Sequence, residues 1–194
     1  MKKWLIPVGI IIALVVIIGF WVVGIKNTAL KHNQAVAKEW GNVETAYQRR
    51  NDLIGNLVNT VKGAAEFEKG TLTAVVEARA KATSVTIDPS NVTPDQMAQF
   101  QQAQSNVSSS LSRLLVSVEA YPQLRANENF LKLQDELAST ENQILTSRTR
   151  FNESVQVYNG YVLTIPNSWF LSGYPEKPYF KSVEGAEKPV EVKF

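Results

Sequence analysis

The chain has 194 residues and a formal net charge of +2, from 20 basic and 18 acidic side chains. This length allows one domain and a targeting segment, and no basic block is long enough to favour nucleic acid as a partner. Cysteine is absent from the sequence, which excludes disulfides, thiolate chemistry and iron–sulfur clusters.

Residues Trp4 to Ile25 form an uncharged run of about 22 residues, long enough as a helix to cross the roughly 30 Å hydrocarbon core of a membrane. A cleaved signal peptide is the alternative, because Lys2 and Lys3 precede the run. The length of the run and the lack of a small-residue cleavage site after it favour a retained transmembrane helix. Trp4 and Trp21 stand near its ends and are candidate membrane-interface anchors.

The orientation of this helix in the membrane is set weakly by the sequence. Lysines lie on both sides of the run, so the positive-inside rule gives almost a tie. Lys2 and Lys3, directly before a long apolar run, resemble a signal anchor, which favours an exported C-terminal domain.

No proline occurs from Thr28 to Lys69, and apolar residues recur there at alternating steps of four and three. This pattern predicts a long helix with a bundle or coiled-coil seam that continues directly from the membrane. The seam consists of Val36, Trp40, Val43, Tyr47, Arg50, Ile54, Leu57, Val61 and Ala64. Gly70 and Thr71 predict the end of this helix and the N-cap of a short second helix.

The second helix is expected to end near Ser84, because residues 85–92 have turn chemistry. Thr93, with a proline next and Gln96 three residues on, predicts a capping box and the start of a third helix. This helix should run to about Glu119 and end before Pro122.

A last helix is predicted from about Asn127 to between Gly160 and Pro166. Its seam consists of Phe130, Gln134, Leu137, Glu141, Ile144, Arg148, Phe151, Val155, Tyr158 and Val162. The sequence therefore predicts an all-α protein with four helical segments after the membrane.

The segment lengths predict an elongated up-down-up antiparallel bundle. The second and third helices together are about as long as the first, so we interpret them as one interrupted middle arm between two long arms. Residues 1–27 are the predicted anchor, residues 28–165 the bundle, and residues 166–194 a tail. The aromatic part of this tail should pack on the bundle end far from the membrane.

The tail contains a candidate interaction patch of aromatic residues. Its members are Trp169, Phe170, Tyr174, Tyr179 and Phe180. Such residues often anchor protein partners, but we favour the interpretation that they form a hydrophobic plug over the end of the bundle.

Polar residues interrupt both seams. In an up-down-up bundle the first and last helices are parallel, and aligning their starts brings Arg50 level with Glu141, between Gln134 and Arg148. We expect an ionic layer here, centred on Arg50 and Glu141. It could fix the register between the arms or serve as a recognition site; buried polar residues are better attested in the first role.

The sequence predicts no catalytic, metal-binding or cofactor-binding residues and no cofactor. The single histidine, His32, has no neighbouring arrangement of acids or nucleophiles, and no phosphate-binding or hydrolase motif occurs. We therefore expect a protein that is not an enzyme.

Two blocks of sequence strongly resemble the LemA family of bacterial membrane proteins. Residues 40–82 contain the string RRNDLIGNLV, and residues 118–159 contain EAYPQLRANENF followed by TEN and YN. Gly55 stands where the family commonly has proline, and Phe151 where it commonly has tyrosine. The resemblance implies a helical bundle anchored by a single span in the bacterial cell membrane, the inner membrane in Gram-negative cells. It supplies no catalytic residues, and it suggests HtpX-type membrane metalloproteases as partners.

Three functions remain open on these observations. The favoured one is a scaffold or adaptor, anchored in the lipid bilayer, that presents a rigid bundle to a membrane protein or to copies of itself. A self-assembling structural protein that remodels the cell envelope is the first alternative, and an unrecognised enzyme is the second.

Overall fold

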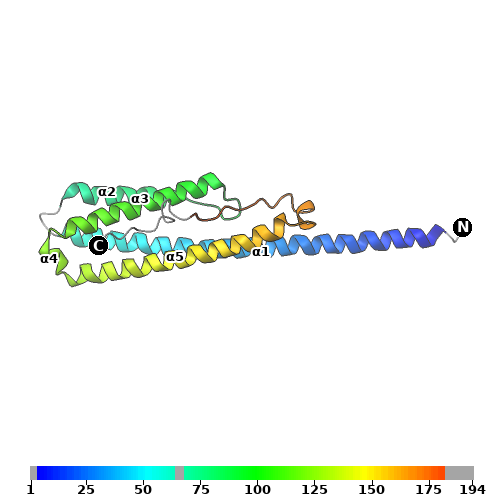
Figure 1. Cartoon of the computed structure of the whole chain (residues 1–194), viewed down its shortest axis with the longest axis horizontal. Coiled ribbons are helices and arrows are strands. Elements are labelled where there is room, and N and C mark those ends of the chain that lie inside the picture. The colour runs from blue at the N-terminus through cyan, green and yellow to red at the C-terminus, as the bar shows by residue number, and fades with distance from the viewer. Residues whose placement is uncertain (1–3, 64–67, 182–194) are drawn as a thin grey trace, which may run out of the picture. The chain divides into compact units, whose positions relative to one another are not determined.

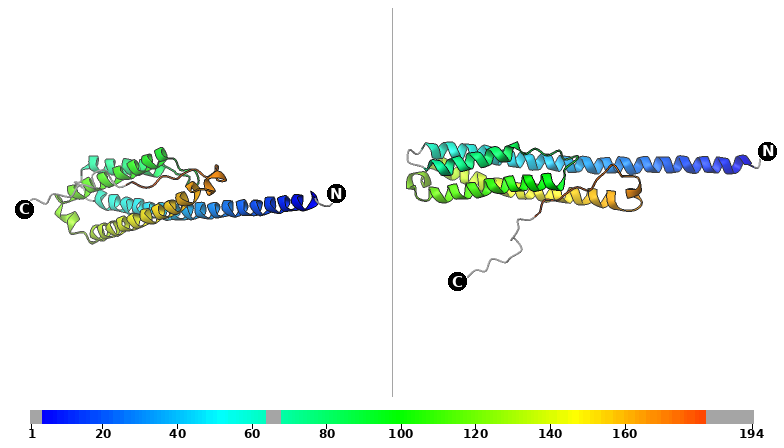
Figure 2. Two further views of the ribbon diagram at one scale, coloured as in Figure 1. Left: turned by 45° about the vertical axis from the view of Figure 1, so that its right-hand side comes forward. Right: turned by 90° about the horizontal axis from the view of Figure 1, so that it is seen from above.

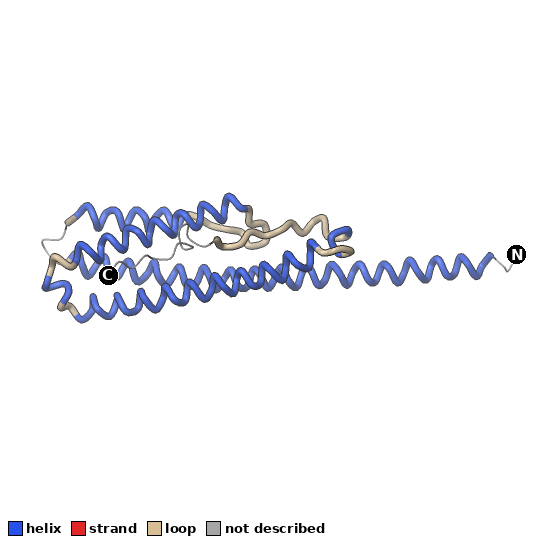
Figure 3. The backbone as a smooth tube through the Cα atoms, viewed as in Figure 1, coloured by secondary structure: helices blue, strands red, loops and turns tan. Residues whose placement is uncertain are grey.

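The computed structural model describes residues 4–63 and 68–181, and within these ranges every regular element is a helix (Figure 1, Figure 3). The elements are α1 (Leu5–Lys62), α2 (Lys69–Ser84), α3 (Pro94–Val118), α4 (Pro122–Arg125), α5 (Glu128–Leu163) and the 3-10 helix η2 (Asn167–Trp169). The all-helical class expected from the sequence is confirmed.

Helix α1 is continuous from the apolar run into the seam, as predicted. Its first five to six turns carry exposed apolar side chains, such as Ile11 and Val15. Further along, the seam is buried from Val36 to Val61, and its last predicted member, Ala64, lies outside the described residues. Among the described residues, α1 is the one helix long and apolar enough to cross a membrane.

Side-chain caps fix the starts of the two later long helices. The Thr93 hydroxyl accepts a hydrogen bond from the Gln96 amide at 3.2 Å, and the Gln96 side chain accepts one from the Thr93 amide at 3.0 Å. The predicted capping box of α3 is therefore present. At α5, the Asn127 side chain accepts a hydrogen bond from the Phe130 amide at 3.1 Å. Both caps satisfy amides that lack a partner within the helix.

The predicted boundary at Gly70 and Thr71 is wrong. Helix α1 ends at Lys62, and the Gly63 amide closes its last turn on the Asn59 carbonyl at 3.3 Å. Both Gly70 and Thr71 lie inside α2, which begins at Lys69. A glycine in the first turn of a helix costs little when the helix is held by tertiary packing, so its presence did not mark a helix end.

The chain divides into two compact units. Unit 1 consists of Met1–Gln48, Asp88–Val92 and Gln143–Lys177, and unit 2 consists of Arg49–Ile87, Thr93–Asn142 and Pro178–Phe194. Helices α1 and α5 each contribute to both units.

In unit 2, α2 and α3 lie side by side and antiparallel, in contact with each other (Figure 1). They are therefore two separate arms, and the predicted single middle arm with a break is wrong. Their apolar faces join those of α1 and α5 in one core. The core includes Ile54, Leu57, Val61, Val75, Val107, Leu114, Phe130 and Leu137.

In unit 1, α1 and α5 run antiparallel, side by side in both views of Figure 2. The Trp40 and Phe151 rings are 5.4 Å apart, whereas Tyr161, later in α5, reaches back to the earlier Ile25 carbonyl. The parallel arrangement expected for the first and last helices is thus wrong. With α2 and α3 as separate arms, the chain reverses direction once more before α5 begins.

The extra reversal also changes the place of the aromatic segment. The Phe170 ring packs edge-on against Trp21, with ring centroids 5.8 Å apart. The segment after α5 therefore lies beside the end of the apolar run of α1, and its predicted place far from the membrane is wrong.

Candidate functional site

A buried polar network in unit 2 is centred on Arg50. This arginine lies in the α1 seam, and its Nη1 donates hydrogen bonds to Glu141 Oε1 and to Ser108 Oγ, each at 3.1 Å. Its Nη2 donates to Gln104 Oε1. The guanidinium thus bonds to α3 and α5 together. The Arg50 side chain is 2% exposed and that of Glu141 is 45% exposed.

The contact between Arg50 and Glu141 was expected from the sequence, but the α3 residues were missed. Gln104 and Ser108 lie one turn apart on α3, in a stretch rich in glutamine, serine and asparagine that gave no signal for a buried polar contact. Of the other expected layer members, Gln134 is half-buried on α5 in unit 2, and Arg148 is half-buried in unit 1.

This network favours one alignment of the helices over its neighbours. A buried guanidinium without hydrogen-bond acceptors is strongly destabilising, so a slip of α3 or α5 by one turn would be penalised. The arrangement thus fits the role of a register-fixing layer.

A second buried polar site, in unit 1, contains Lys177, which is 2% exposed. Its ammonium group donates hydrogen bonds to the carbonyl oxygens of Pro89 at 2.6 Å and Ser90 at 2.9 Å. The Asn159 side chain pairs with both the amide and the carbonyl of Lys177, at 2.9 Å each. The ammonium group also lies 5.1 Å from the centre of the Tyr158 ring. These bonds fasten two loop segments to α5.

The electrostatics of this site follow from burial. Desolvation lowers the pKa of Lys177, and the nearby Asp88 carboxylate opposes the shift. Desolvation also raises the pKa of Tyr158, whose hydroxyl donates a hydrogen bond to the Pro175 carbonyl at 3.1 Å. No sequence signal identified Lys177, because it stands in a tail rich in lysine, glutamate and proline.

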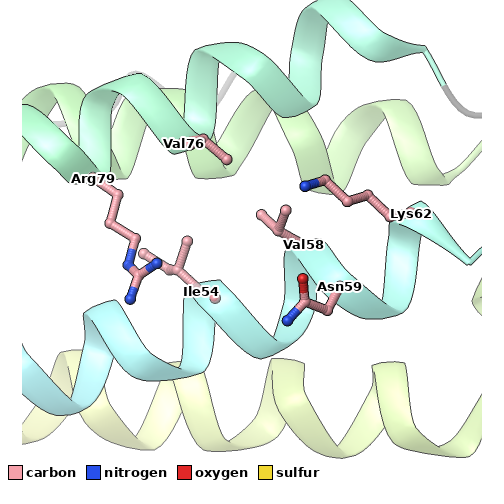
Figure 4. Close-up of a pocket in the computed structure, with 7 residues that line it drawn as sticks. Ile54, Val58, Asn59, Lys62, Val76 and Arg79 are labelled. Atoms are coloured by element: carbon pink, nitrogen blue, oxygen red, sulfur yellow. The ribbon is translucent and has the colours of Figure 1, made fainter.

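A hollow of about 200 Å³ lies between α1 and α2 in unit 2 (Figure 4). It is lined by Ile54, Gly55, Val58, Asn59, Lys62, Val76 and Arg79. Arg79 projects from α2 and Lys62 from α1, with Val58 between them. Within residues 4–63 and 68–181, the Arg79 side chain makes no hydrogen bond or ion pair. The hollow therefore combines an apolar floor with basic groups at its rim.

Gly55 allows Arg79 to approach α1 closely. A Cβ atom added to Gly55 would lie 3.3 Å from Arg79 Nη1, which is tighter than an ordinary van der Waals contact. The arginine head group therefore packs directly on the α1 backbone beside the hollow.

The predicted aromatic residues divide between the two units. Trp169 is exposed, whereas Phe170 and Tyr174 are half-buried, all in unit 1. In unit 2, Tyr179 is exposed and Phe180 is buried with its ring 6.3 Å from that of Phe100.

The remaining sequence candidates lie along α1 or close to its start. Trp4 is 80% exposed and Trp21 is 49% exposed. His32 is half-buried, with its ring 5.2 Å from that of Tyr161. In the part of the chain that the structure describes, no three potential metal ligands come together.

These features define a class of protein: an all-helical bundle with internal polar layers, built on a long helix with an apolar N-terminal part. The LemA family model matches residues 39–194. The chain belongs to the LemA family.

Several named proteins are similar to this chain. Protein LemA of Metamycoplasma hominis is 22% identical over 145 residues, which cover 75% of this chain and 63% of that protein. Magnetosome protein MamQ 2 of Paramagnetospirillum magneticum is 21% identical over 185 residues, covering 84% and 67%. Magnetosome protein MamQ of Magnetospirillum gryphiswaldense is 23% identical over 180 residues, covering 82% and 65%. The matched part of the chain spans about two thirds of the length of these relatives.

Proposed function

We propose that this protein is a membrane-anchored adaptor that presents a helical bundle to a membrane partner. The observation that carries the proposal is the continuity of α1 from Leu5 to Lys62. Its exposed apolar part supplies the anchor, and its buried seam supplies one arm of the bundle. A single helix transmits position and orientation from the bilayer to the bundle better than a flexible linker would.

The hollow between α1 and α2 is the surface proposed to receive the partner. Its basic rim, from Arg79 and Lys62, complements a carboxylate, and its floor of Ile54 and Val58 accepts an apolar side chain. We therefore expect an acidic residue next to an apolar one in the contacting segment of the partner. A carboxylate bound here would give Arg79 an ion-pair partner at a partly desolvated position. An ion pair contributes more to the binding free energy there than on an open surface.

A membrane metalloprotease of the HtpX type is the partner that the family resemblance suggests. The adaptor proposal does not depend on that choice, because any membrane protein that displays a suitable acidic segment near the bilayer meets the same requirement. A homo-oligomer is the alternative, and it would make this protein a structural element of the envelope.

Site-specific photo-crosslinking in intact cells tests the proposal. A photoreactive residue at Val76, which is 43% exposed at the edge of the hollow, should capture a distinct membrane protein. The charge reversal Arg79→Glu should abolish this product. The matched reversal Arg113→Glu, at an exposed position on α3, should leave it unchanged.

The outcomes separate the alternatives. A crosslinked product that contains only copies of this chain would contradict the adaptor function and support a self-assembling structural protein. A product that survives Arg79→Glu and Arg113→Glu equally would show that the hollow is not the contact surface.

A further inference from the structure

The last residue of α5 and the segment that follows it expose large apolar side chains. Leu163 is 54% exposed, Ile165 is 65% exposed and Trp169 is 70% exposed. The surrounding sequence carries no charge, since no lysine, arginine, histidine, aspartate or glutamate occurs from Ser154 to Pro175. We call residues 163–170 the Trp169 loop. Exposed apolar groups clustered in a neutral segment mark a surface that is covered by an apolar partner.

The Trp169 loop lies beside the last turn of the apolar run of α1. The Phe170 ring contacts Trp21 at 5.8 Å, and the Tyr161 hydroxyl donates to the Ile25 carbonyl at 3.3 Å. Lys26, the first charged residue after the run, follows directly. At 1.5 Å per residue, Trp21 lies about 6 Å before the end of the run. The loop therefore lies at the level where the run ends.

Several polar groups of the loop already make hydrogen bonds within the protein, which favours an apolar environment. The amide of Ser168 donates to Thr164 at 3.0 Å, that of Trp169 to Pro166 at 3.2 Å, and that of Phe170 to Asn167 at 2.9 Å. The Asn167 side chain donates to the Tyr161 carbonyl at 3.1 Å. Polar groups that are already paired inside the loop do not have to give up water without compensation, which removes a large part of the cost of insertion.

We propose that the Trp169 loop is a second membrane contact, which inserts its apolar side chains into the headgroup and acyl boundary of the bilayer that α1 crosses. The proposal rests on the proposed function, because it requires α1 to span a membrane. Lipid is the occupant because Trp21, the loop's neighbour, is itself exposed within the apolar run. Phe170, whose ring packs on Trp21, is the residue next to Trp169, so a bilayer around the last turn of that run also reaches the loop. Tryptophan favours this depth, and insertion of about 5–10 Å is typical of interfacial anchors.

A single-span helix alone leaves the protein free to rotate about the helix axis. A second contact beside the helix fixes which side of unit 1 faces the bilayer. The loop would thus set the orientation of unit 1, because α5 carries it directly.

Depth measurements on the full-length chain in phosphatidylcholine vesicles test the proposal. The natural absence of cysteine permits single labels, so a fluorophore is attached to Ile165→Cys, with Val15→Cys as the membrane control and Ser105→Cys as the aqueous control. Nitroxide lipids should quench the probe at position 165 as well as the probe at position 15. The probe at position 105 should remain unquenched.

A second measurement uses the cysteine-free chain. Brominated lipids quench tryptophan on contact, and the Trp169→Ser variant should lose the part of this quenching that Trp169 contributes. Equal quenching of the parent chain and Trp169→Ser would overturn the proposal.

The controls distinguish the two proposals. If the probe at position 165 behaves like that at position 105 while position 15 is quenched, the second contact is refuted and the membrane anchor stands. If position 15 is also unquenched, α1 does not span the bilayer and both proposals fail. A probe at position 165 that nitroxide lipids do not quench, and that is protected from water only at a high protein-to-lipid ratio, would show that a second copy covers the loop. That result also refutes lipid contact.

Discussion

The Arg50 guanidinium is buried, whereas the carboxylate of Glu141 is about half exposed. This asymmetry determines how the two residues should respond to substitution. Glu141→Leu leaves a buried charge without its counter-ion, at an expected cost of about 2–3 kcal/mol. Arg50→Leu adds an apolar residue to an apolar seam and leaves a carboxylate that water can reach, but it also removes the donor to the buried Gln104 side chain, so its expected cost is about 1–2 kcal/mol.

Urea denaturation of the detergent-solubilised chain, followed by circular dichroism, measures these differences. The double variant should cost about as much as Arg50→Leu alone, because no charge is then left buried. Asp135→Leu, at an exposed position on α5, is the matched control and should change stability by less than about 0.5 kcal/mol. Small, additive effects of the two substitutions would show that the pair does not fix the register.

Lys177 should make the stability of unit 1 depend on pH in the alkaline range. Its pKa is lowered in the folded state, so between that pKa and 10.5 the unfolded chain binds more protons than the folded chain. The contribution of Lys177 to the free energy of unfolding therefore rises with pH across this window. Tyr158 acts oppositely: its pKa is raised, so its contribution falls as the pH passes 10.0.

Comparison with Lys177→Met isolates the lysine, because Tyr158 is present in both proteins. The parent chain should be more stable than the variant at neutral pH, since the variant loses the hydrogen bonds to Pro89 and Ser90. This advantage should grow as the pH rises towards 10.5. A stability difference between the parent chain and Lys177→Met that decreases over that range would contradict the assigned direction of the pKa shift.

At the scale of the element, the glycines inside α1 allow a matched comparison. A Cβ atom at Gly41 would meet nothing within 4 Å, whereas one at Gly55 would lie 3.3 Å from Arg79. Gly41→Ala should therefore stabilise α1 by about 0.5–1 kcal/mol, the usual helix propensity gain. Gly55→Ala should gain less, because the Arg79 head group must move. Thermal unfolding that gives Gly55→Ala the larger gain would show that Arg79 does not pack on α1 as described.

The capping box at the start of α3 gives a second prediction about an element. Thr93→Ala removes the acceptor of the Gln96 amide, and its expected cost is about 1 kcal/mol of stability. Thr73→Ala is the control: its hydroxyl bonds back to the Lys69 carbonyl inside α2, where alanine is at least as favourable. Chemical denaturation measures the stability of both variants. Equal losses of stability in Thr93→Ala and Thr73→Ala would show that the cap does not stabilise α3.

At the scale of the whole molecule, we predict that the chain stays at full length in the membrane fraction. The apolar run of α1 is long and lacks a processing site. Extraction at alkaline pH followed by intact-mass measurement tests this, with the periplasmic or culture fraction as the comparison. A soluble species that begins after Gly24 would show that the run is a cleaved signal.

The direction of the helix in the membrane is the second prediction at this scale. Lys2 and Lys3 before the apolar run favour an exported bundle. A membrane-impermeant maleimide should therefore label Ser105→Cys in intact cells, and the cysteine-free parent chain controls for background. Labelling that appears only after lysis would place the bundle in the cytoplasm.

Local features of the sequence determined most of the helices. The capping box at Thr93, the cap at Asn127 and the seam from Val36 to Val61 depend on contacts within one or two turns, or on the period of the apolar residues. These local signals do not depend on how the arms are arranged, so they predict the helices without predicting the packing. The family assignment also came from the sequence, through ordered strings such as RRNDLIGNLV.

The number and direction of the arms were decided by tertiary structure alone. The combined length of α2 and α3 fits one broken arm as well as two antiparallel arms, because helix periodicity carries no information about reversal in a loop. The contact of Arg50 with Glu141 was still anticipated. Arg50 precedes the end of α1 by about as many residues as Glu141 follows the start of α5. The observed antiparallel alignment of α1 and α5 therefore brings the two residues level, as the predicted parallel alignment did.

Long-range packing likewise created the sites that the sequence did not reveal. Lys177 is buried because it meets the Pro89 and Ser90 carbonyls from a distant part of the chain. The Trp169 loop lies beside Trp21 because α5 runs antiparallel to α1. Local sequence sets the conformation of each helix, whereas burial and pairing of side chains depend on which helices meet, and that is settled only when the whole chain packs.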